Sequence, residues 1–288
     1  MLISIASGKG GTGKTTVSAS LTTVWDGPVT AVDLDVEEPN LHLFLNPWIA
    51  SEDKVYLNVP EVDESLCTLC RECSSLCQFK AINVMGSAIL TFPEMCHGCG
   101  GCMAICPEKA ISWGRRELGT LSTGKSGFND FLMGRLRVGE AMSPPLMRAV
   151  KERLVKNLDH RGGDAIIDAP PGVSCPAVCA VMDTDFILLV TEPTPFGLHD
   201  FKLALEAFVP FNKPVAAVIN RSGLGDAGVE RFCSEQGIPV LAHIPFDRDI
   251  AGAYSRGKVI AELSPELRSV FVQLARSIKE MGAGGRDA

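Results

Sequence analysis

The chain has 288 residues, of which 46% are hydrophobic, and a formal net charge of −7. This length allows one main domain with a smaller module, and an acidic chain with only 27 Lys and Arg is not expected to bind nucleic acid. No apolar run approaches the roughly 18–20 residues of a membrane span, and the start of the chain shows no signal-peptide pattern. We therefore expect a cytoplasmic protein without stable membrane insertion.

Strands and helices are predicted to alternate in two separate parts of the chain. Residues 2–6 indicate a buried strand, residues 14–24 a helix, and the segment GPVTAVDLD a second buried strand that ends in two aspartates. The alternation stops near residue 50 and returns near residue 140, with strand-like segments such as DAIIDAPPG, DFILLVTEP and KPVAAVIN. This order predicts a mostly parallel sheet with helices on both faces. We expect a discontinuous α/β domain made of residues 1–50 and 140–288.

A repeat of cysteines interrupts this domain. The segment CTLCRECSSLCQFKAINV at 67–84 matches CHGCGGCMAICPEKAISW at 96–113, and every cysteine is offset by 29 residues. A duplication of this kind predicts a small two-fold symmetric α+β module, which we place at residues 51–116, with 117–139 as a connecting loop or hairpin. Cysteines at this density, in a chain expected to be cytoplasmic, indicate metal binding rather than disulfides.

Each half of the repeat reads C-x2-C-x2-C-x3-C and so resembles the bacterial two-cluster ferredoxins, in which the fourth cysteine of each run binds the other cluster. The first [4Fe–4S] cluster is then expected to take Cys67, Cys70, Cys73 and Cys106, and the second Cys96, Cys99, Cys102 and Cys77. Zinc is the competing interpretation, although zinc sites usually pair two separated C-x2-C knuckles. One departure from the ferredoxin pattern is that Pro107 follows the second run, whereas Gln78 follows the first.

The segment GKGGTGKT at residues 8–15 fits the phosphate-binding pattern G-x-x-x-x-G-K-[ST], with a predicted strand before it and a predicted helix after it. Glycines let backbone N–H groups close around phosphate oxygens, and the start of a helix presents its positive dipole end to the anion. Lys14 is expected to reach the β- and γ-phosphates, and the Thr15 hydroxyl to bind Mg²⁺. The nucleotide-binding residues expected in the loop are Gly8, Lys9, Gly10, Gly11, Thr12, Gly13, Lys14, Thr15 and Thr16.

The same pattern occurs a second time, in GTLSTGKS at residues 119–126. There the charged segment GRREL precedes it in place of an apolar strand, and no amphipathic helix follows. We interpret this second match as accidental and expect it in a loop or hairpin.

The second lysine of the first loop has no role in the general pattern. The stretch KGGTGKT resembles the deviant Walker A motif of the MinD/Mrp/nitrogenase-iron-protein superfamily of dimeric P-loop ATPases. The resemblance implies that Lys9 crosses a dimer interface to the partner's nucleotide, where it stabilises charge during phosphoryl transfer as an arginine finger does. It also implies an ATP-dependent homodimer, or a heterodimer with a related ATPase.

Two further segments resemble the switch loops of that superfamily. VDLDVEEPNL resembles switch I, which implies that Asp35 orients the attacking water and that Asp33 supports Mg²⁺ through water. IIDAPPG resembles switch II, which implies a Walker-B-like contact of Asp168 with Mg²⁺. Asn220, at the end of a predicted strand, matches an asparagine that reads the adenine edge in relatives. Helix capping and turn formation are the structural alternatives for Asp33 and Asp35.

The chain thus resembles MinD-superfamily ATPases with an inserted ferredoxin domain, and the resemblance implies ATP or ADP, Mg²⁺ and two [4Fe–4S] clusters as cofactors. The insertion lies between switch I and switch II, the loops that sense the γ-phosphate. We expect an ATP-hydrolysing carrier that gates electron transfer to an unidentified redox partner. A scaffold for clusters or metallocofactors is a second hypothesis, and a MinD-like positional ATPase is a third.

Overall fold

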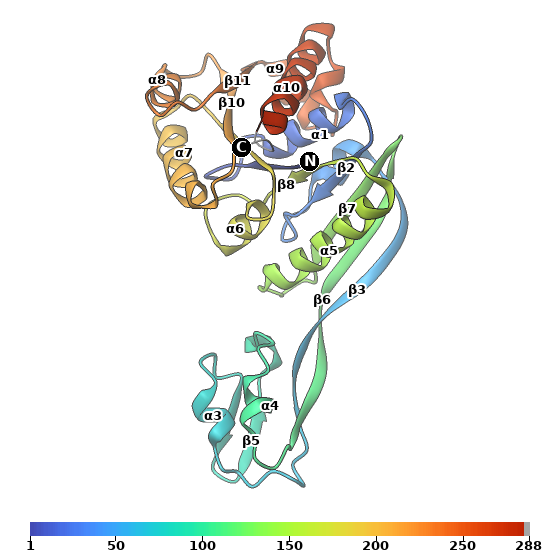
Figure 1. The fold of residues 1–288 in the computed structure, drawn as a ribbon, viewed down its shortest axis with the longest axis vertical. Helices are drawn as coiled ribbons and strands as arrows, with labels where there is room; N and C mark the ends of the chain where they lie inside the picture. The colour runs from blue at the N-terminus through green and yellow to red at the C-terminus, as the bar shows by residue number, and fades with distance from the viewer. Residues whose placement is uncertain (285–288) are drawn as a thin grey trace.

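The computed structural model describes residues 1–284, and nine of its strands form one sheet (Figure 1). In the order of the sheet, the strands are β11 (Val240–Pro245), β10 (Val215–Ser222), β9 (Phe186–Thr191), β1 (Leu2–Ala6), β8 (Asp164–Asp168), β2 (Val29–Asp33), β7 (Asn129–Leu136), β6 (Ile111–Ser126) and β3 (Trp48–Val62). Neighbours from β11 to β7 run parallel, whereas β6 is antiparallel to both β7 and β3. The predicted fold class, a mostly parallel α/β sheet, is confirmed.

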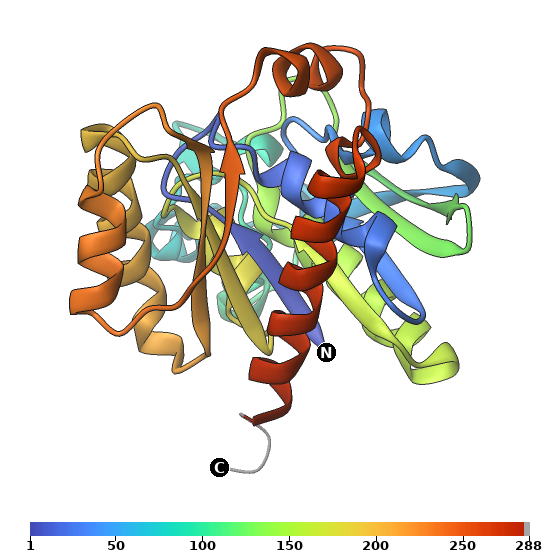
Figure 2. The same cartoon turned by 90° about the horizontal axis from the view of Figure 1, so that it is seen from above.

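Helices cover both faces of this sheet because its central strands are apolar on both sides. The segment FILLVT of β9, for example, is buried along its whole length, as expected for a parallel strand between two layers of helices. One face carries α1 (Lys14–Val24), α2 (Leu41–Leu45) and α10 (Pro265–Gly284). The other face carries α5 (Ser143–Arg161), α6 (Cys175–Val181), α7 (Pro195–Phe208) and α8 (Gly228–Glu235). Figure 2 shows α10 and α7 on opposite sides of the strands.

The rest of the C-terminal part is short. It consists of α9 (Arg248–Tyr254) and two 3-10 turns, η2 (Val209–Phe211) and η3 (Ile260–Glu262). Within residues 1–284, no helix is both long and apolar enough to cross a membrane.

A two-stranded ribbon leaves the sheet and carries the cysteine module (Figure 1). Strands β3 and β6 pair along almost their whole length, but β7 pairs only with the half of β6 that runs from Gly119 to Ser126. The other half therefore extends past Leu136, where β7 ends. Because β7 runs parallel to β2, the ribbon projects from the edge at which the parallel strands have their carboxyl ends. Ligands of open α/β sheets bind along that edge.

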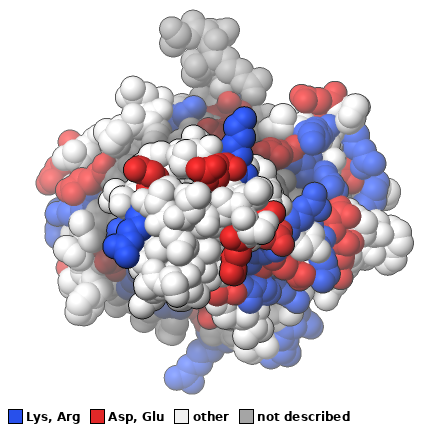
Figure 3. Space-filling model, turned by 90° about the horizontal axis from the view of Figure 1, so that it is seen from below, with Lys and Arg blue, Asp and Glu red and all other residues white. Residues whose placement is uncertain are grey.

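The cysteine module has little apolar core of its own. Its elements are α3 (Glu72–Leu76), β4 (Ile82–Met85), β5 (Ala88–Thr91), η1 (Pro93–Met95) and α4 (Gly101–Ile105). Figure 3, which views the molecule from the end that carries the module, shows a broad area with few charged side chains. The large apolar side chains exposed on the module are Leu66, Leu76, Phe79, Met85, Leu90, Phe92, Met95, Ile105 and Trp113.

Residues 117–139, expected as a connecting loop or hairpin, form a hairpin that is part of the main sheet, made by the end of β6 and all of β7. The start of β3 also lies in this sheet, so strands of the α/β domain occur within the range assigned to the insertion. The second phosphate-loop match, at 119–126, lies in β6, and both edges of that strand are paired. Its backbone N–H groups therefore cannot surround a phosphate.

Candidate nucleotide site and cysteine module

The phosphate loop connects β1 to α1, and the motif of residues 8–15 runs from this loop into the first turn of α1, which begins at Lys14. Gly13 has φ of 98°, a left-handed conformation that favours glycine. A Cβ atom at Gly13 would lie 2.3 Å from Nδ2 of Asn220, and one at Gly8 would lie 1.9 Å from the carbonyl oxygen of Asp200 in α7. The tight packing of the loop against α7 and the end of β10 therefore requires glycine at both positions.

Asn220, predicted to read adenine, lies at the base of this loop. Its Nδ2 donates a hydrogen bond of 2.7 Å to the carbonyl oxygen of Thr12, and its Oδ1 accepts one of 2.9 Å from its neighbour's backbone N–H. Arg221, which has φ of 55°, also reaches the loop, because its Nη2 donates to the carbonyl oxygen of Gly11 at 3.1 Å. These two residues hold the phosphate loop against β10.

The structure brings Asp33, Asp35 and Asp168 together, because β2 and β8 are neighbours whose ends lie in register, and Asp35 and Asp168 lie near Lys14. Asp33 accepts hydrogen bonds from the backbone N–H groups of Asp35 at 3.1 Å and Leu41 at 2.9 Å. Asp33 therefore shapes switch I as well as facing the site. Its capping contacts and its predicted support of Mg²⁺ are compatible, since a carboxylate offers several acceptor positions.

Burial of these charged groups shifts their pKa values. Burial, with Asp168 nearby, raises the pKa of Asp35 to about 6. Burial likewise raises the pKa of Asp33 and of Asp168, and it lowers the pKa of Lys14 even though the neighbouring carboxylates favour the charged amine. Carboxylates crowded in this way are stabilised by a bound cation.

One residue of this site was missed in the sequence. The Oγ of Ser18 donates to Asp168 Oδ1 at 2.9 Å, and the Thr15 side chain also hydrogen-bonds Asp168. Ser18 lies one helical turn after Lys14, on the same face of α1, so helical spacing was the available signal. The contact links the helix that follows the phosphate loop to the predicted Mg²⁺ ligand of switch II.

The side chain of Lys9 contacts a residue of the same chain that was not predicted from the sequence. Its Nζ lies 2.5 Å from Oε1 of Glu192, and the other oxygen of that carboxylate lies 2.9 Å from Nη1 of Arg221. Burial acts to raise the pKa of Glu192, but its bonds to Lys9 and Arg221 lower the pKa overall. Lys9 of the phosphate loop is thus held by an ion pair with Glu192 of the same chain.

A cleft of about 470 Å³ opens between the two switch segments and the loop that joins β7 to α5. The lining residues are Asp35, Glu37, Glu38, Leu136, Arg137, Val138, Gly139, Glu140, Pro170, Pro171, Ser174 and Pro176. The cleft therefore places residues at the foot of the ribbon next to the switches.

The structure also groups the eight cysteines of the repeat into the two predicted sets. One cavity is lined by Cys67, Cys70, Cys73 and Cys106 together with apolar side chains that include Val84, Ile89 and Ile111. A second cavity, of about 350 Å³, is lined by Cys77, Cys96, Cys99 and Cys102 together with Phe79, His97 and Trp113. The fourth cysteine of each run faces the cavity of the other run, as the ferredoxin-like spacing predicts.

The loops around both cavities share an unusual backbone. Positive φ occurs at Leu69, Arg71 and Lys80 in the first half and at Gly98, Gly100 and Lys109 in the second, again 29 residues apart. Left-handed backbone is costly for non-glycine residues, so the repeat maintains it against local preference. It helps to turn N–H groups inward, as in the hydrogen bond of 3.3 Å from Gly98 N–H to Cys96 Sγ.

Cys77 shows the same effect in its titration. Burial acts to raise the pKa of the Cys77 thiol, but backbone N–H groups, led by those of Ala81 and Ile82, lower it overall.

Across residues 1–284, no three His, Cys, Asp or Glu side chains converge on one point as the ligands of a single ion do. The cysteines are instead distributed around cavities.

The domain model for the CobQ/CobB/MinD/ParA nucleotide binding domain matches residues 3–260. Two uncharacterized proteins of Methanocaldococcus jannaschii match over 287 residues; one is 31% identical and covers 97% of this chain, the other is 28% identical and covers 96%, and each match covers 97% of the relative. The iron-sulfur cluster carrier protein of Aquifex aeolicus is 26% identical over 159 residues, which are 48% of this chain and 43% of that protein.

Solved structures show the same fold. The cell division ATPase MinD of Pyrococcus furiosus aligns with a TM-score of 0.57 at 23% identity, covering 97% of this chain and 98% of that chain. The septum site-determining protein MinD of Pyrococcus horikoshii, solved with Mg-ADP, aligns with a TM-score of 0.57 at 21% identity, covering 99% of this chain and 98% of that chain. On the match of the domain model and of the full-length relatives, the chain belongs to the CobQ/CobB/MinD/ParA family of nucleotide-binding domains.

Proposed function

We propose that the protein is an Mg²⁺-dependent ATPase whose nucleotide state gates electron transfer through two [4Fe–4S] clusters to a partner redox protein. The observation that carries this proposal is the ribbon of β3 and β6. It projects from the sheet edge that contains the phosphate loop and both switches, and it ends in the module with the two cysteine sets. Nucleotide and cysteine sites are thus joined by one continuous element.

The proposed nucleotide site uses the residues of the phosphate loop and both switches. Lys14 and the loop N–H groups would hold the phosphates, Thr15 and Asp168 would bind Mg²⁺ with Asp33 supporting it through water, and Asp35 would orient the attacking water. The buried Oγ of Thr12 has no hydrogen-bond partner among residues 1–284, which fits a ligand at this loop. In a dimer with itself or a related ATPase, Lys9 exchanges Glu192 for the partner's nucleotide.

The arrangement of the cysteines favours [4Fe–4S] clusters over zinc. A cubane holds its four irons apart and needs thiolates set around a volume, whereas zinc needs four thiolates about 2.3 Å from one point. Four cysteines around each cavity, apolar lining and inward N–H groups all favour the cluster. Bound clusters would supply one-electron chemistry, and the chain's contribution is to hold them, limit their contact with water and set their distance from the switches.

A cluster carrier is the second candidate function. It is favoured by the partial matches to proteins named iron-sulfur cluster carrier protein, which cover 48% of this chain. In a carrier, clusters leave the chain, whereas in an electron carrier they stay bound through many turnovers. A positional role like that of MinD rests on the fold alone.

The deciding experiment uses anaerobically purified protein that contains about eight iron and eight sulfide per chain. Midpoint potentials of the clusters are measured by titration with and without Mg·ATP, and iron transfer to an apo-ferredoxin probe is measured in parallel. A potential shift with iron retained supports gated electron transfer, and ATP-dependent loss of iron to the probe supports the carrier. If neither responds to ATP, both proposals are wrong.

A further inference from the structure

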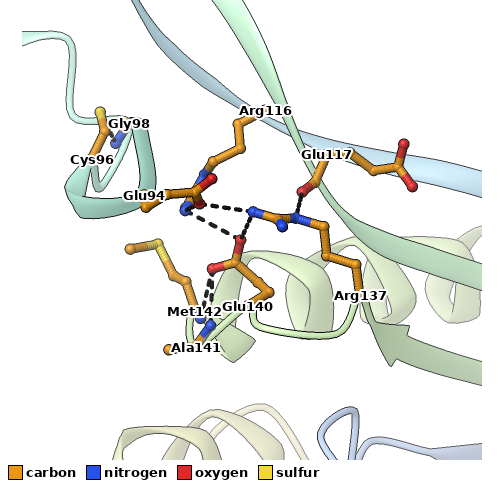
Figure 4. Close-up of polar contacts among 9 residues, drawn as sticks. All are labelled: Glu94, Cys96, Gly98, Arg116, Glu117, Arg137, Glu140, Ala141 and Met142. Carbon is orange, nitrogen blue, oxygen red and sulfur yellow. Dashed lines mark hydrogen bonds and ion pairs between the residues drawn. The ribbon is translucent and has the colours of Figure 1, made fainter. Parts of the chain in front are cut away.

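Two arginines join the cysteine module to the α/β domain (Figure 4). Arg116 lies on the ribbon part of β6, and Arg137 directly follows β7. Nη1 of Arg116 lies 2.8 Å from Oε2 of Glu94 and 3.2 Å from Oε2 of Glu140. Nη2 of Arg137 lies 2.7 Å and 3.3 Å from the same two oxygens. The two arginines therefore share one carboxylate of the module and one of the α/β domain.

The two carboxylates differ in exposure. The Glu140 side chain is 2% exposed and the Arg116 side chain 5%, whereas the Glu94 side chain is 67% exposed. Nε and Nη2 of Arg116 are buried and have no acceptor within residues 1–284, so Glu94 and Glu140 alone orient this guanidinium. Separating the buried pair would leave a charge without a partner, while Glu94 can exchange its contacts for water at little cost. We call Glu94, Arg116, Arg137 and Glu140 together the joint. Glu94 is the residue of the joint that can separate from the others.

On the α/β side, the joint is attached to switch I. The backbone N–H of Leu136 donates to the carbonyl oxygen of Val36 at 2.8 Å, and Oγ of Ser143 donates to the Glu37 carboxylate. Val36 and Glu37 directly follow Asp35, the predicted water-orienting residue. Leu136 and Ser143 flank the loop of residues 137–142, which carries Arg137 and Glu140. A movement of switch I therefore pulls on both ends of this loop.

The loop itself is tightly held. Oε1 of Glu140 accepts hydrogen bonds from the backbone N–H groups of Ala141 at 3.1 Å and Met142 at 3.0 Å, just before α5 begins. Nε of Arg137 donates to the carbonyl oxygen of Glu117 on the ribbon at 2.6 Å. A loop with these bonds moves with switch I instead of absorbing the movement.

On the module side, the joint reaches the second cysteine set. Glu94 lies in η1, two residues before Cys96, and the Sγ of Cys96 accepts the hydrogen bond from Gly98 N–H. Figure 4 shows this cysteine loop beside the four charged residues. Switch I is thus connected to the cysteine loop of the second cavity in three steps. Hydrogen bonds join switch I to the ends of the loop of residues 137–142, ion pairs join Glu140 of that loop to the two arginines, and ion pairs join the arginines to Glu94.

We propose that Glu94, Arg116, Arg137 and Glu140 are positioning residues that transmit the nucleotide state of switch I to the loop of Cys96–Cys102. This inference rests on the proposed function, because it assigns the route by which ATP gates the second cluster. The first cysteine set, which has no corresponding ion-pair contact with the α/β domain in residues 1–284, responds less.

Hydrogen–deuterium exchange of the full-length, cluster-loaded protein tests this route. Exchange is measured with and without Mg²⁺ and a slowly hydrolysed ATP analogue. We expect the analogue to change exchange at residues 94–102 by about 5-fold or more, the lower end of typical coupling between two sites. Glu94→Gln should abolish this response while ATP hydrolysis continues, and Glu94→Asp, which keeps the charge, should retain part of it. Lys54→Gln, which breaks an exposed ion pair on the same ribbon, is the matched control and should respond as wild type does.

Either of two exchange results would overturn the proposal: no response at residues 94–102 in wild type, or a full response in Glu94→Gln. The first means that switch I does not reach the module, and the second that coupling follows another route. If the response depends on Glu94 but cluster potentials ignore ATP, the joint stands and the gating function is wrong. If ATP shifts the potentials equally in wild type and Glu94→Gln, the gating function stands and the joint is wrong.

Discussion

The nucleotide edge and the cysteine module hold their functional groups in different ways. At the nucleotide edge, Asp33, Asp168 and Lys14 are buried in a domain with two large apolar cores, so the finished sheet holds them in place. In the module, the buried apolar side chains are few, Ile82 and Ile111 among them, and cysteines line its cavities. A unit of this size rarely folds on so small a core. The comparison implies that the first site is preformed, whereas the second depends on what it binds.

Loss of one cysteine should produce the largest difference between the two regions. Cys70→Ser removes an exposed thiol of the first set, so the module should lose one cluster and with it most of its protection from hydrogen exchange over residues 67–113. The strands of the α/β sheet should keep their protection, and ATP should still bind. Iron analysis and hydrogen–deuterium exchange on the same sample measure both effects.

Cys175→Ser is the control, because Cys175 is also exposed but lies at the start of α6, outside both cavities. Protection of the module that persists after complete removal of iron would contradict the comparison. The small apolar core would then be sufficient for folding.

Lys9 tests whether the preformed site is complete in one chain. Lys9→Ala should lower turnover by on the order of 1,000-fold, as loss of an arginine finger does, with little change in ATP affinity because Lys14 remains. Hydrolysis per wild-type chain should also rise with protein concentration. Steady-state assays over a range of concentrations, together with ATP titrations, measure these effects.

A mixture sharpens the result. When Lys9→Ala chains are combined with Lys14→Ala chains, the intact Lys9 of one chain can face the intact nucleotide site of the other. Return of activity indicates action in trans. A chain that stays monomeric with a slowly hydrolysed ATP analogue, and hydrolyses at a rate independent of concentration, would show that Lys9 acts within its own chain.

Local sequence patterns predicted the functional groups of both regions, whereas contacts between distant segments were not predicted. The spacing of residues 8–15 and the 29-residue offset of the cysteines are local patterns, so the phosphate loop and both cysteine groups could be recognised directly. The strand-and-helix alternation was likewise sufficient for the parallel sheet. Contacts between distant segments leave no such pattern: the Lys9–Glu192 pair joins residues 183 positions apart.

The ribbon was missed for a related reason. Most of β3 is exposed and alternates only at Val55, Leu57 and Val59, and the ribbon half of β6 contains the charged run Arg115, Arg116 and Glu117. Neither segment therefore shows a sustained apolar alternation, which marks a half-buried strand. Their pairing with each other stabilises them, and that pairing depends on register across the inserted module. The joint of Glu94, Arg116, Arg137 and Glu140 is a consequence of this register.

Two lysines in matching motifs offer a smaller but cleaner comparison. Lys14→Ala should weaken ATP binding by about 100-fold, since charge-assisted hydrogen bonds are worth roughly 3 kcal/mol at most. Lys125→Ala should leave affinity unchanged, because Lys125 lies on β6, where it pairs with Asp130 at 3.8 Å. Calorimetric titration of both variants measures the difference. Equal losses would mean that the strand at 119–126 takes part in nucleotide binding.

The smallest effect concerns the cost of preforming the nucleotide site. Asp35 has a pKa raised to about 6 by burial, so the folded protein binds its proton more tightly than the unfolded chain does. Between about pH 6 and pH 4, the free energy of unfolding of the nucleotide-free α/β domain should therefore rise as pH falls. Asp33 and Asp168, whose pKa values are also raised, act in the same direction.

Asp35→Asn isolates the contribution of this one carboxylate. Between pH 7 and pH 4.5, wild type should gain about 1–2 kcal/mol of stability that the variant does not, once solvent screening of a partly exposed group is allowed for. Urea unfolding at several pH values, with Asp26→Asn as an exposed control, measures this difference. Turnover should have the opposite pH dependence, because a protonated Asp35 is a poorer hydrogen-bond acceptor for the attacking water, and activity should fall as this carboxyl takes up its proton. A wild-type stability that decreased through this range in parallel with Asp35→Asn would show that the buried carboxylate is already stabilised by its neighbours, and that the nucleotide edge is not preformed at a cost.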